Sequence, residues 1–168
     1  PIGNNQQDFL NGLQHGISGA GLITRFDASL FKTRFACELK NFNPEDFLDR
    51  KEARKLDPFA QYALVVAEEA MKDSGIELEK VNRMKFGVIW GSGIGGFYTL
   101  ETDISEAALL TGPPRYSPFL IPKLISDIAP GHISIKYGLM GINYGTVSAC
   151  ASSSHAISTA YDYITYGT

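Results

Sequence analysis

The sequence has few cysteines, no long apolar run and no excess of basic residues. Its 2 cysteines, Cys37 and Cys150, stand far apart in 168 residues and do not suggest a disulfide framework, so we expect a reducing, cytoplasmic location. No apolar run reaches the ~18 residues that span a bilayer. No signal peptide with a basic start and an apolar core is present either, so no membrane association is expected.

The charge balance is slightly acidic. The 15 Lys and Arg residues are outnumbered by 18 Asp and Glu residues, which gives a formal net charge of −3. General nucleic-acid binding usually requires a basic excess and is therefore not expected. No His and Cys residues have metal-ligand spacing, so no metal site is expected. The length and the 44% hydrophobic content suffice for one domain with a core.

The two ends of the sequence are unusual for a complete protein. The sequence begins with Pro1 and not with an initiator Met. It stops at Gly167 and Thr168, where a helix would receive its C-terminal glycine. We therefore expect a fragment of a longer chain.

Strands alternate with helices along the sequence, which predicts the α/β class. Asp57 and Pro58 are typical of a helix start, and Gly75 of its end. We expect prolines 122 and 130 to interrupt a helical region. We also expect the last helix, which is poor in charge, to be buried between layers. The expected helices are residues 4–16, 58–74, 97–110 and 151–166, with further helical pieces within 117–137. A break is expected at Gly112-Pro113-Pro114. The expected strands are residues 35–39, 86–90 and 144–149.

Cys150 lies where a strand of small residues meets a helix. Free N–H groups and the helix dipole at such a position lower the pKa of a thiol, and the thiolate is a nucleophile. The sequence context thus suggests attack on a carbonyl, although a lone Cys is more often buried and inert. Cys37 has no such context, and we interpret it as structural.

A glycine-rich loop follows the expected strand 86–90. Gly91, Gly93 and Gly96 match the spacing of a dinucleotide-binding loop. That motif also needs a second strand ending in Asp or Glu about 20 residues later, and residues 111–116 offer neither. A tight turn with close backbone approach is the favoured interpretation.

A short basic cluster precedes Asp57. Lys51, Arg54 and Lys55 stand at helical spacing on one face, either as a solvated surface or as a docking site for an acidic protein. His155, five residues after Cys150, is poorly placed to act as its base. His15 and His132 are expected to be structural or exposed.

Four segments together resemble one enzyme family. They are residues 50–57, 91–96, 117–138 and 147–156, which include Val147-Ser148-Ala149-Cys150-Ala151-Ser152-Ser153-Ser154-His155-Ala156. In order and spacing they are similar to the β-ketoacyl-acyl-carrier-protein synthases, with the closest likeness to the bacterial type II synthases of fatty-acid elongation.

The resemblance implies a thiolase-like layered α/β fold, of which residues 1–168 would be the N-terminal ketoacyl-synthase domain without its first strand. It implies a homodimer that works with acyl carrier protein. A cysteine accepts the acyl group, and malonyl-carrier protein then loses carbon dioxide and attacks the acyl thioester. No cofactor is implied, because the substrates arrive on the phosphopantetheine arm of the carrier.

The resemblance also assigns roles to residues. Cys150 corresponds to the nucleophile, and its backbone N–H to one oxyanion donor. Ile94, Phe119 and Leu120 correspond to the acyl pocket, where Leu120 replaces a residue that is usually aromatic. The basic cluster corresponds to the surface that docks acyl carrier protein.

Several family residues are absent from this sequence. The two catalytic histidines, the active-site lysine and the second oxyanion donor belong to the C-terminal half of the family, so we expect the fragment alone to be inactive. Three alternatives stay open: a polyketide ketosynthase, a thiolase-like acyltransferase, and a non-catalytic carrier-binding fragment.

Overall fold

The computed structural model describes residues 1–113 and 115–167, so Pro114 in the expected break and the expected terminus at Thr168 lie outside the described residues. The chain divides into two compact units, Pro1–Asn43 and Pro44–Thr168, and each is described by itself. The single domain expected over the whole chain stays a prediction.

The first unit contains one helix and one short strand pair. Helix α1 (Gln6–Gln14) begins at Asn5, whose side chain accepts a hydrogen bond from the N–H of Asp8. Strand β1 (Gly21–Leu22) pairs antiparallel with β2 (Phe35–Ala36). The expected strand 35–39 is therefore only two residues long.

Cys37 directly follows β2 and is exposed. Our interpretation of Cys37 as a structural residue is therefore wrong in that its side chain is not buried in a core.

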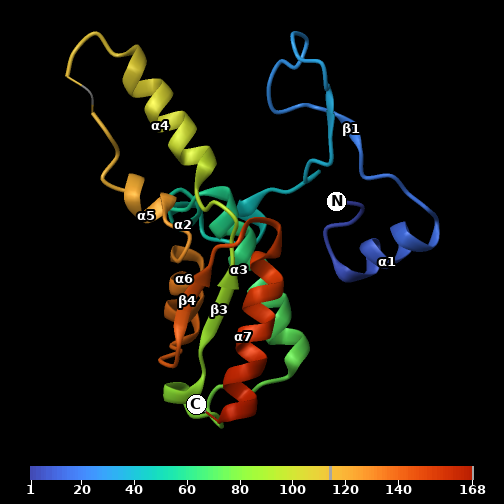
Figure 1. Cartoon of the computed structure of the whole chain (residues 1–168), viewed down its shortest axis with the longest axis vertical. Helices are drawn as coiled ribbons and strands as arrows, with labels where there is room; N and C mark the ends of the chain where they lie inside the picture. The colour runs from blue at the N-terminus through green and yellow to red at the C-terminus, as the bar shows by residue number, and fades with distance from the viewer. Residues whose placement is uncertain (114, 168) are drawn as a thin grey trace. The chain divides into compact units, whose positions relative to one another are not determined.

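The second unit contains the parallel strand pair and the longer helices (Figure 1). Its elements are η1 (Pro44–Asp46), α2 (Arg50–Ala53), α3 (Pro58–Ser74), η2 (Arg83–Lys85), β3 (Val88–Gly91), α4 (Phe97–Leu109), α5 (Leu120–Leu124), α6 (Ile128–Tyr137), β4 (Asn143–Thr146), η3 (Ala149–Ala151) and α7 (Ser152–Tyr166).

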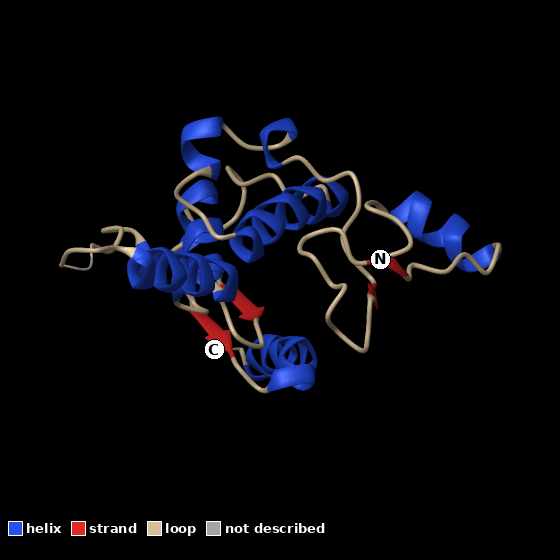
Figure 2. Cartoon of the chain, turned by 90° about the horizontal axis from the view of Figure 1, so that it is seen from above, coloured by secondary structure: helices blue, strands red, loops and turns tan. Residues whose placement is uncertain are grey.

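Strands β3 and β4 form a two-stranded parallel sheet with helices on both sides (Figure 2). Side chains alternate along a strand, and β3 follows that rule. Val88 and Trp90 pack against the core of α3 and α6, whereas Ile89 and Gly91 face α7. The sheet is therefore the middle layer between α7 and the α3–α6 pair.

Small residues bring α3 and α6 close together. Ala60, Ala63 and Ala129 are each 0% exposed, and their methyl groups leave room for the larger Leu64 and Ile133. Close packing of this kind makes each core side chain sensitive to changes in volume.

The observed elements correct three expectations. Strand β3 is only half-buried and starts at Val88, and β4 ends at Thr146, before Ala149. Pro122 and Pro130 do not interrupt helices, because each is the third residue of its helix. The first turn needs no intrahelical donor, so a proline fits there.

The expectation that α7 is buried between layers is also wrong for the described residues. One face packs on β3 and β4, and the opposite face is open to solvent. Ile157, Tyr161 and Ile164 are 72%, 68% and 82% exposed. Their spacing of three and four residues places them on one side of the helix, and no described residue covers that side.

Asp57 stabilises two helix starts with one buried carboxylate. Its Oδ1 accepts a hydrogen bond from the N–H of Phe59 at 3.1 Å, which caps α3 as expected. Its Oδ2 accepts one from the N–H of Thr99 at 2.8 Å, in the first turn of α4. Helix α4 has no side-chain cap of its own at Gly96. The carboxylate therefore anchors α4 to the start of α3.

An ion pair also joins α3 to α6. Glu68 lies 2.7 Å from Lys136 of α6 and 2.9 Å from Lys72. The hydrogen bonds from Lys136 and Lys72 lower the pKa of Glu68 to about 2, and the bond from Lys136 has the larger effect. Because the folded-state pKa lies below the unfolded one, the pair stabilises the fold above about pH 4.5, and this stabilisation is lost as the pH falls towards 2.

We predict that Asp57→Ala lowers the free energy of unfolding by about 2–3 kcal/mol, because two helix starts lose their acceptor. Urea denaturation of the purified protein measures this. Asp73→Ala, at an exposed position of the same helix, is the control and should change stability by less than about 0.5 kcal/mol. Equal stabilities of the two variants would contradict the role of Asp57.

Candidate functional site

The parallel pairing places two loops at the same edge of the sheet. Gly91 pairs with Thr146 at the carboxyl ends of β3 and β4. The glycine loop that follows β3 and the cysteine turn that follows β4 therefore leave the sheet side by side. In α/β sheets, this edge is where ligands usually bind.

Cys150 is exposed and lies in η3, two residues before α7 begins. The structure thus confirms a cysteine between a strand and a helix N-terminus. The residue before it, Ala149, has a φ of 50°. The left-handed conformation costs a non-glycine residue about 1–2 kcal/mol, so neighbouring contacts must stabilise this turn.

Side chains on both sides of Cys150 supply those contacts. The Oγ of Ser152 donates a hydrogen bond to the carbonyl of Ala149 at 2.8 Å and accepts one from the N–H of Ser148 at 2.9 Å. The hydroxyl of Thr146 donates to the carbonyl of Ser152 at 2.8 Å. Each bond contributes about 0.5–1.5 kcal/mol, so together they can offset the conformational cost.

His155 belongs to the same network. Its Nδ1 lies 2.7 Å from the Oγ of Ser148. The imidazole therefore makes its contact with a serine, in agreement with the expectation that it is poorly placed to act as the base for Cys150.

The glycines of the loop allow close approach of backbones. A Cβ at Gly91 would lie 2.5 Å from the N of Ser153 and 2.6 Å from the C of Ser152. A Cβ at Gly93 would lie 3.6 Å from the carbonyl oxygen of Ala149. Contact with the first turn of α7 thus accounts for Gly91, whereas the distance at Gly93 is an ordinary van der Waals contact that does not require a glycine.

The expected acyl-pocket residues lie on two neighbouring segments. Ile94 is in the glycine loop and is 67% exposed. Phe119, 45% exposed, directly precedes α5, and Leu120 is the first residue of that helix. The N–H of Gly96 donates to the carbonyl of Leu124 at 2.9 Å, so α5 packs against the glycine loop. The glycine loop therefore contacts the C-terminal end of α5 through Gly96 and lies beside Ala149 of the cysteine turn at Gly93. The assignment of Ile94, Phe119 and Leu120 to an acyl pocket stays a prediction.

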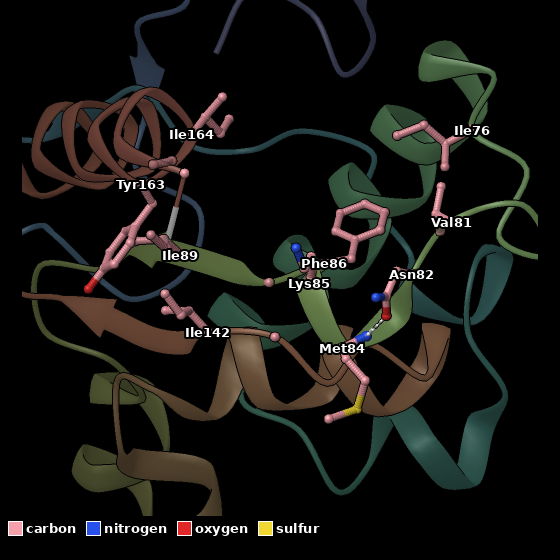
Figure 3. Close-up of a pocket in the computed structure, with 14 residues that line it drawn as sticks. Ile76, Val81, Asn82, Met84, Lys85, Phe86, Ile89, Ile142, Tyr163 and Ile164 are labelled. Atoms are coloured by element: carbon pink, nitrogen blue, oxygen red, sulfur yellow. Dashed lines mark hydrogen bonds between the residues drawn. The ribbon is translucent and has the colours of Figure 1, made fainter.

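The cavity in Figure 3 lies at the other end of the strands. It has a volume of about 790 Å³, and its lining residues include Tyr163 and Ile164 of α7 together with Ile76 and Val81. Its remaining lining residues are Asn82, Met84, Lys85, Phe86, Gly87, Ile89, Gly141, Ile142, Ala160 and Gly167. Neither Cys150 nor the expected acyl-pocket residues line it.

The basic cluster surrounds the C-terminal end of α2. Lys51, Arg54 and Lys55 are exposed, and within residues 1–113 and 115–167 none of them forms an ion pair. Ala53 and Leu56 of the same segment are buried at 4% and 6% exposure. The segment is therefore anchored by its apolar side chains and leaves three cations available to solvent.

The remaining histidines show no catalytic arrangement. His15 is exposed, with its Nδ1 2.9 Å from the carbonyl of Asn11. Burial lowers the pKa of His132, and the charge of Glu52 opposes that shift.

No group of metal-ligating side chains occurs among the described residues, and no helix in that part of the chain is long and apolar enough to cross a membrane.

Sequence reasoning missed Ala149 and Ser152. A positive φ at an alanine has no sequence signature, and the run Ser152-Ser153-Ser154 does not indicate which hydroxyl is buried. The only available signal was the concentration of small residues around Cys150.

Comparison with known proteins yields consistent matches. Residues 1–168 match the family described as the β-ketoacyl synthase N-terminal domain. The 3-oxoacyl-[acyl-carrier-protein] synthase 2 of Synechocystis sp. is 43% identical over 167 residues, which are 99% of this chain and 40% of that relative. The chain thus spans less than half the length of such relatives.

Two solved structures share the fold. The ishigamide ketosynthase/chain length factor superposes with a TM-score of 0.88 at 24% identity, over 99% of this chain and 41% of its own. A type II polyketide synthase acyl carrier protein in complex with its ketosynthase matches with a TM-score of 0.70 at 24% identity, over 77% of this chain and 37% of that chain. These ketosynthases have the thiolase fold, so the expected layered α/β class is confirmed.

We predict that Gly91→Ala lowers the free energy of unfolding by about 1–3 kcal/mol, because the new methyl group meets the backbone of α7. Thermal or urea denaturation measures the change. Gly131→Ala is the matched control. Its methyl group meets nothing within 4 Å in α6, so stability should stay the same or rise. A Gly91→Ala variant as stable as this control would disprove the close contact.

Proposed function

Because the chain belongs to the β-ketoacyl synthase family, matching its N-terminal domain over residues 1–168, we propose that it is part of a condensing enzyme that extends acyl chains. The exposed Cys150, on a turn fixed by hydrogen bonds beside the glycine loop, is the observation that carries this proposal. The 3-oxoacyl-[acyl-carrier-protein] synthase 2 of Synechocystis sp., at 43% identity, supports 3-oxoacyl-[acyl-carrier-protein] synthesis as the reaction.

Cys150 is the proposed acyl acceptor. Its thiolate attacks the carbonyl carbon of an acyl thioester, and the carbonyl oxygen becomes negative. The N–H of Cys150 donates no hydrogen bond to any described residue and is available to this oxyanion. Collapse of the intermediate expels the thiolate of the carrier arm and leaves the acyl group on Cys150.

The second half of the reaction uses a malonyl thioester. Loss of carbon dioxide gives a carbanion, which attacks the acyl carbonyl on Cys150. Expulsion of the Cys150 thiolate releases a β-ketoacyl chain two carbons longer. The family's histidine pair, which assists decarboxylation, is not in this sequence. We therefore propose that the whole protein carries the activity and that a chain of these 168 residues alone does not condense substrates.

Ile94, Phe119 and Leu120 are proposed to contact the acyl chain. Phe119 and Ile94 are apolar and at least 45% exposed, so an alkyl chain that covered them would remove apolar surface from water. Leu120 replaces an aromatic residue of the family and would leave more space. The reaction needs no cofactor in this proposal. The homodimer and the cytoplasmic location implied by the family stay predictions.

Acyl carrier protein is the proposed partner of Lys51, Arg54 and Lys55. The three exposed cations without ion pairs suit an acidic protein surface. A structural neighbour, a ketosynthase solved with its acyl carrier protein, supports the idea that this fold receives such a partner.

A polyketide ketosynthase is the second candidate. One solved neighbour is a ketosynthase of a type II polyketide synthase, but at 24% identity it argues for the fold alone. The higher identity, 43%, to the 3-oxoacyl-[acyl-carrier-protein] synthase 2 favours fatty-acid elongation. Product analysis of the whole protein separates the two, since repeated condensation without reduction would indicate a polyketide.

We predict that cerulenin, an inhibitor directed at condensing-enzyme cysteines, labels Cys150 stoichiometrically in the folded protein and leaves Cys37 unlabelled. Both thiols are exposed, so Cys37 is an internal control for mere accessibility. Peptide mass spectrometry locates the label. A folded protein with no label on Cys150, or with equal label on both cysteines, would favour the non-catalytic alternative.

We further predict that Lys55→Glu weakens binding of acyl carrier protein by about threefold to tenfold, and that added salt weakens the wild-type complex. Lys32→Glu makes the same charge change at an exposed position of the first unit and should leave the affinity unchanged. Isothermal titration calorimetry gives both dissociation constants. Equal affinities would refute docking at the basic cluster.

A further inference from the structure

The hydroxyl of Ser152 is buried beside an exposed cysteine. Ser152 is only 3% exposed, whereas Cys150, two residues earlier, is open to solvent. Burial of a hydroxyl is unfavourable unless hydrogen bonds replace those to water. Its bonds therefore show what the hydroxyl stabilises.

Both of these bonds reach back across Cys150. The Oγ of Ser152 accepts from the N–H of Ser148 at 2.9 Å and donates to the carbonyl of Ala149 at 2.8 Å. Neither partner is an N–H of the first turn of α7, and the N-cap residue of that helix, Ala151, has no side-chain cap. Helix capping therefore does not explain the hydroxyl.

The bond to Ala149 acts directly on the backbone of Cys150. The carbonyl of Ala149 and the N–H of Cys150 belong to one trans peptide group and point in opposite directions. The backbone N–H of Ser152 donates to the same carbonyl. Both hydrogen bonds hold the carbonyl towards Ser152 and consequently hold the N–H of Cys150 away from it. Without the bond from the hydroxyl, Ala149 would lose one of the two contacts that stabilise its positive φ of 50°.

We propose that Ser152 is a positioning residue for Cys150: its hydroxyl fixes the peptide between Ala149 and Cys150 and so aims the N–H of Cys150 at the oxyanion. This inference rests on the proposed function, because it gives the N–H of Cys150 the role of an oxyanion donor. Thr146 supports the arrangement, since its hydroxyl holds the carbonyl of Ser152 at 2.8 Å.

The test compares two reactions of Cys150 in the whole protein. Acylation by an acyl-carrier thioester requires a correctly placed oxyanion donor, whereas alkylation by iodoacetamide requires only an accessible thiolate. Ser152→Ala should slow acylation by about tenfold to a hundredfold and change alkylation much less. Ser154→Ala, at an exposed position of α7, is the matched control and should change neither rate.

A second pair of variants separates the hydroxyl from side-chain shape. The threonine of Ser152→Thr keeps the hydroxyl. The valine of Ser152→Val has nearly the same shape as that threonine but carries a methyl group in place of the hydroxyl. Thr should retain acylation and Val should lose it, which also decides the question if Ser152→Ala does not fold. Alkylation of Cys37 and the melting temperature monitor folding.

Three results would overturn the proposal. The first is an unchanged acylation rate in folded Ser152→Ala, and the second is an equal loss of acylation and alkylation in that variant. The third is an equal acylation rate in Ser152→Thr and Ser152→Val. If wild-type Cys150 is alkylated but never acylated, the proposed function fails instead. Crystal structures of the wild type and Ser152→Ala then test the positioning role alone. Ala149 should leave its positive φ in the variant, and an unchanged turn would contradict the inference.

Discussion

The parallel pairing of β3 with β4 is the constraint on which the rest of the structure depends. It sets the ends of two strands, 55 residues apart in sequence, opposite each other at Gly91 and Thr146. The glycine loop and the cysteine turn can meet only because both strands end there. Gly91 has no side chain, so the first turn of α7 can lie directly on the end of β3. The location of Cys150 is thus a consequence of strand register.

A second connection runs from the surface to this edge. Ala53 and Leu56 anchor the segment that presents the basic cluster, and Asp57 follows immediately. The carboxylate of Asp57 then binds the start of α4, the helix that continues from the glycine loop. One buried side chain therefore links the proposed carrier-docking segment to the loop beside Cys150. In the proposed function, this link keeps the docking surface and the reacting thiol in a constant relation.

Local signals in the sequence predicted local structure well. Asp57 with Pro58 and Gly75 gave the limits of α3, and the small residues around Cys150 gave the turn between β4 and α7. Long-range consequences were not predictable in the same way. The bond from Asp57 to Thr99 spans 42 residues, and its partner is a backbone N–H, which every residue except proline possesses.

Burial and strain were the other limits of sequence reasoning. Cys37 and the outer face of α7 carry apolar or weakly polar side chains, yet they are exposed among the described residues. Ser152 is polar, yet it is buried because its hydroxyl is paired on both sides. Composition gives an average tendency, and individual hydrogen bonds decide the exceptions.

The central claim is that Cys150, at the carboxyl edge of β3 and β4, accepts the acyl group. The most direct measurement is a crystal structure of the whole protein after incubation with an acyl-carrier thioester. The account predicts electron density for an acyl chain bonded to the Sγ of Cys150, with its carbonyl oxygen at the N–H of Cys150 and its alkyl part against Ile94 and Phe119. A bare thiol at Cys150, with the acyl group bound elsewhere, would contradict the account.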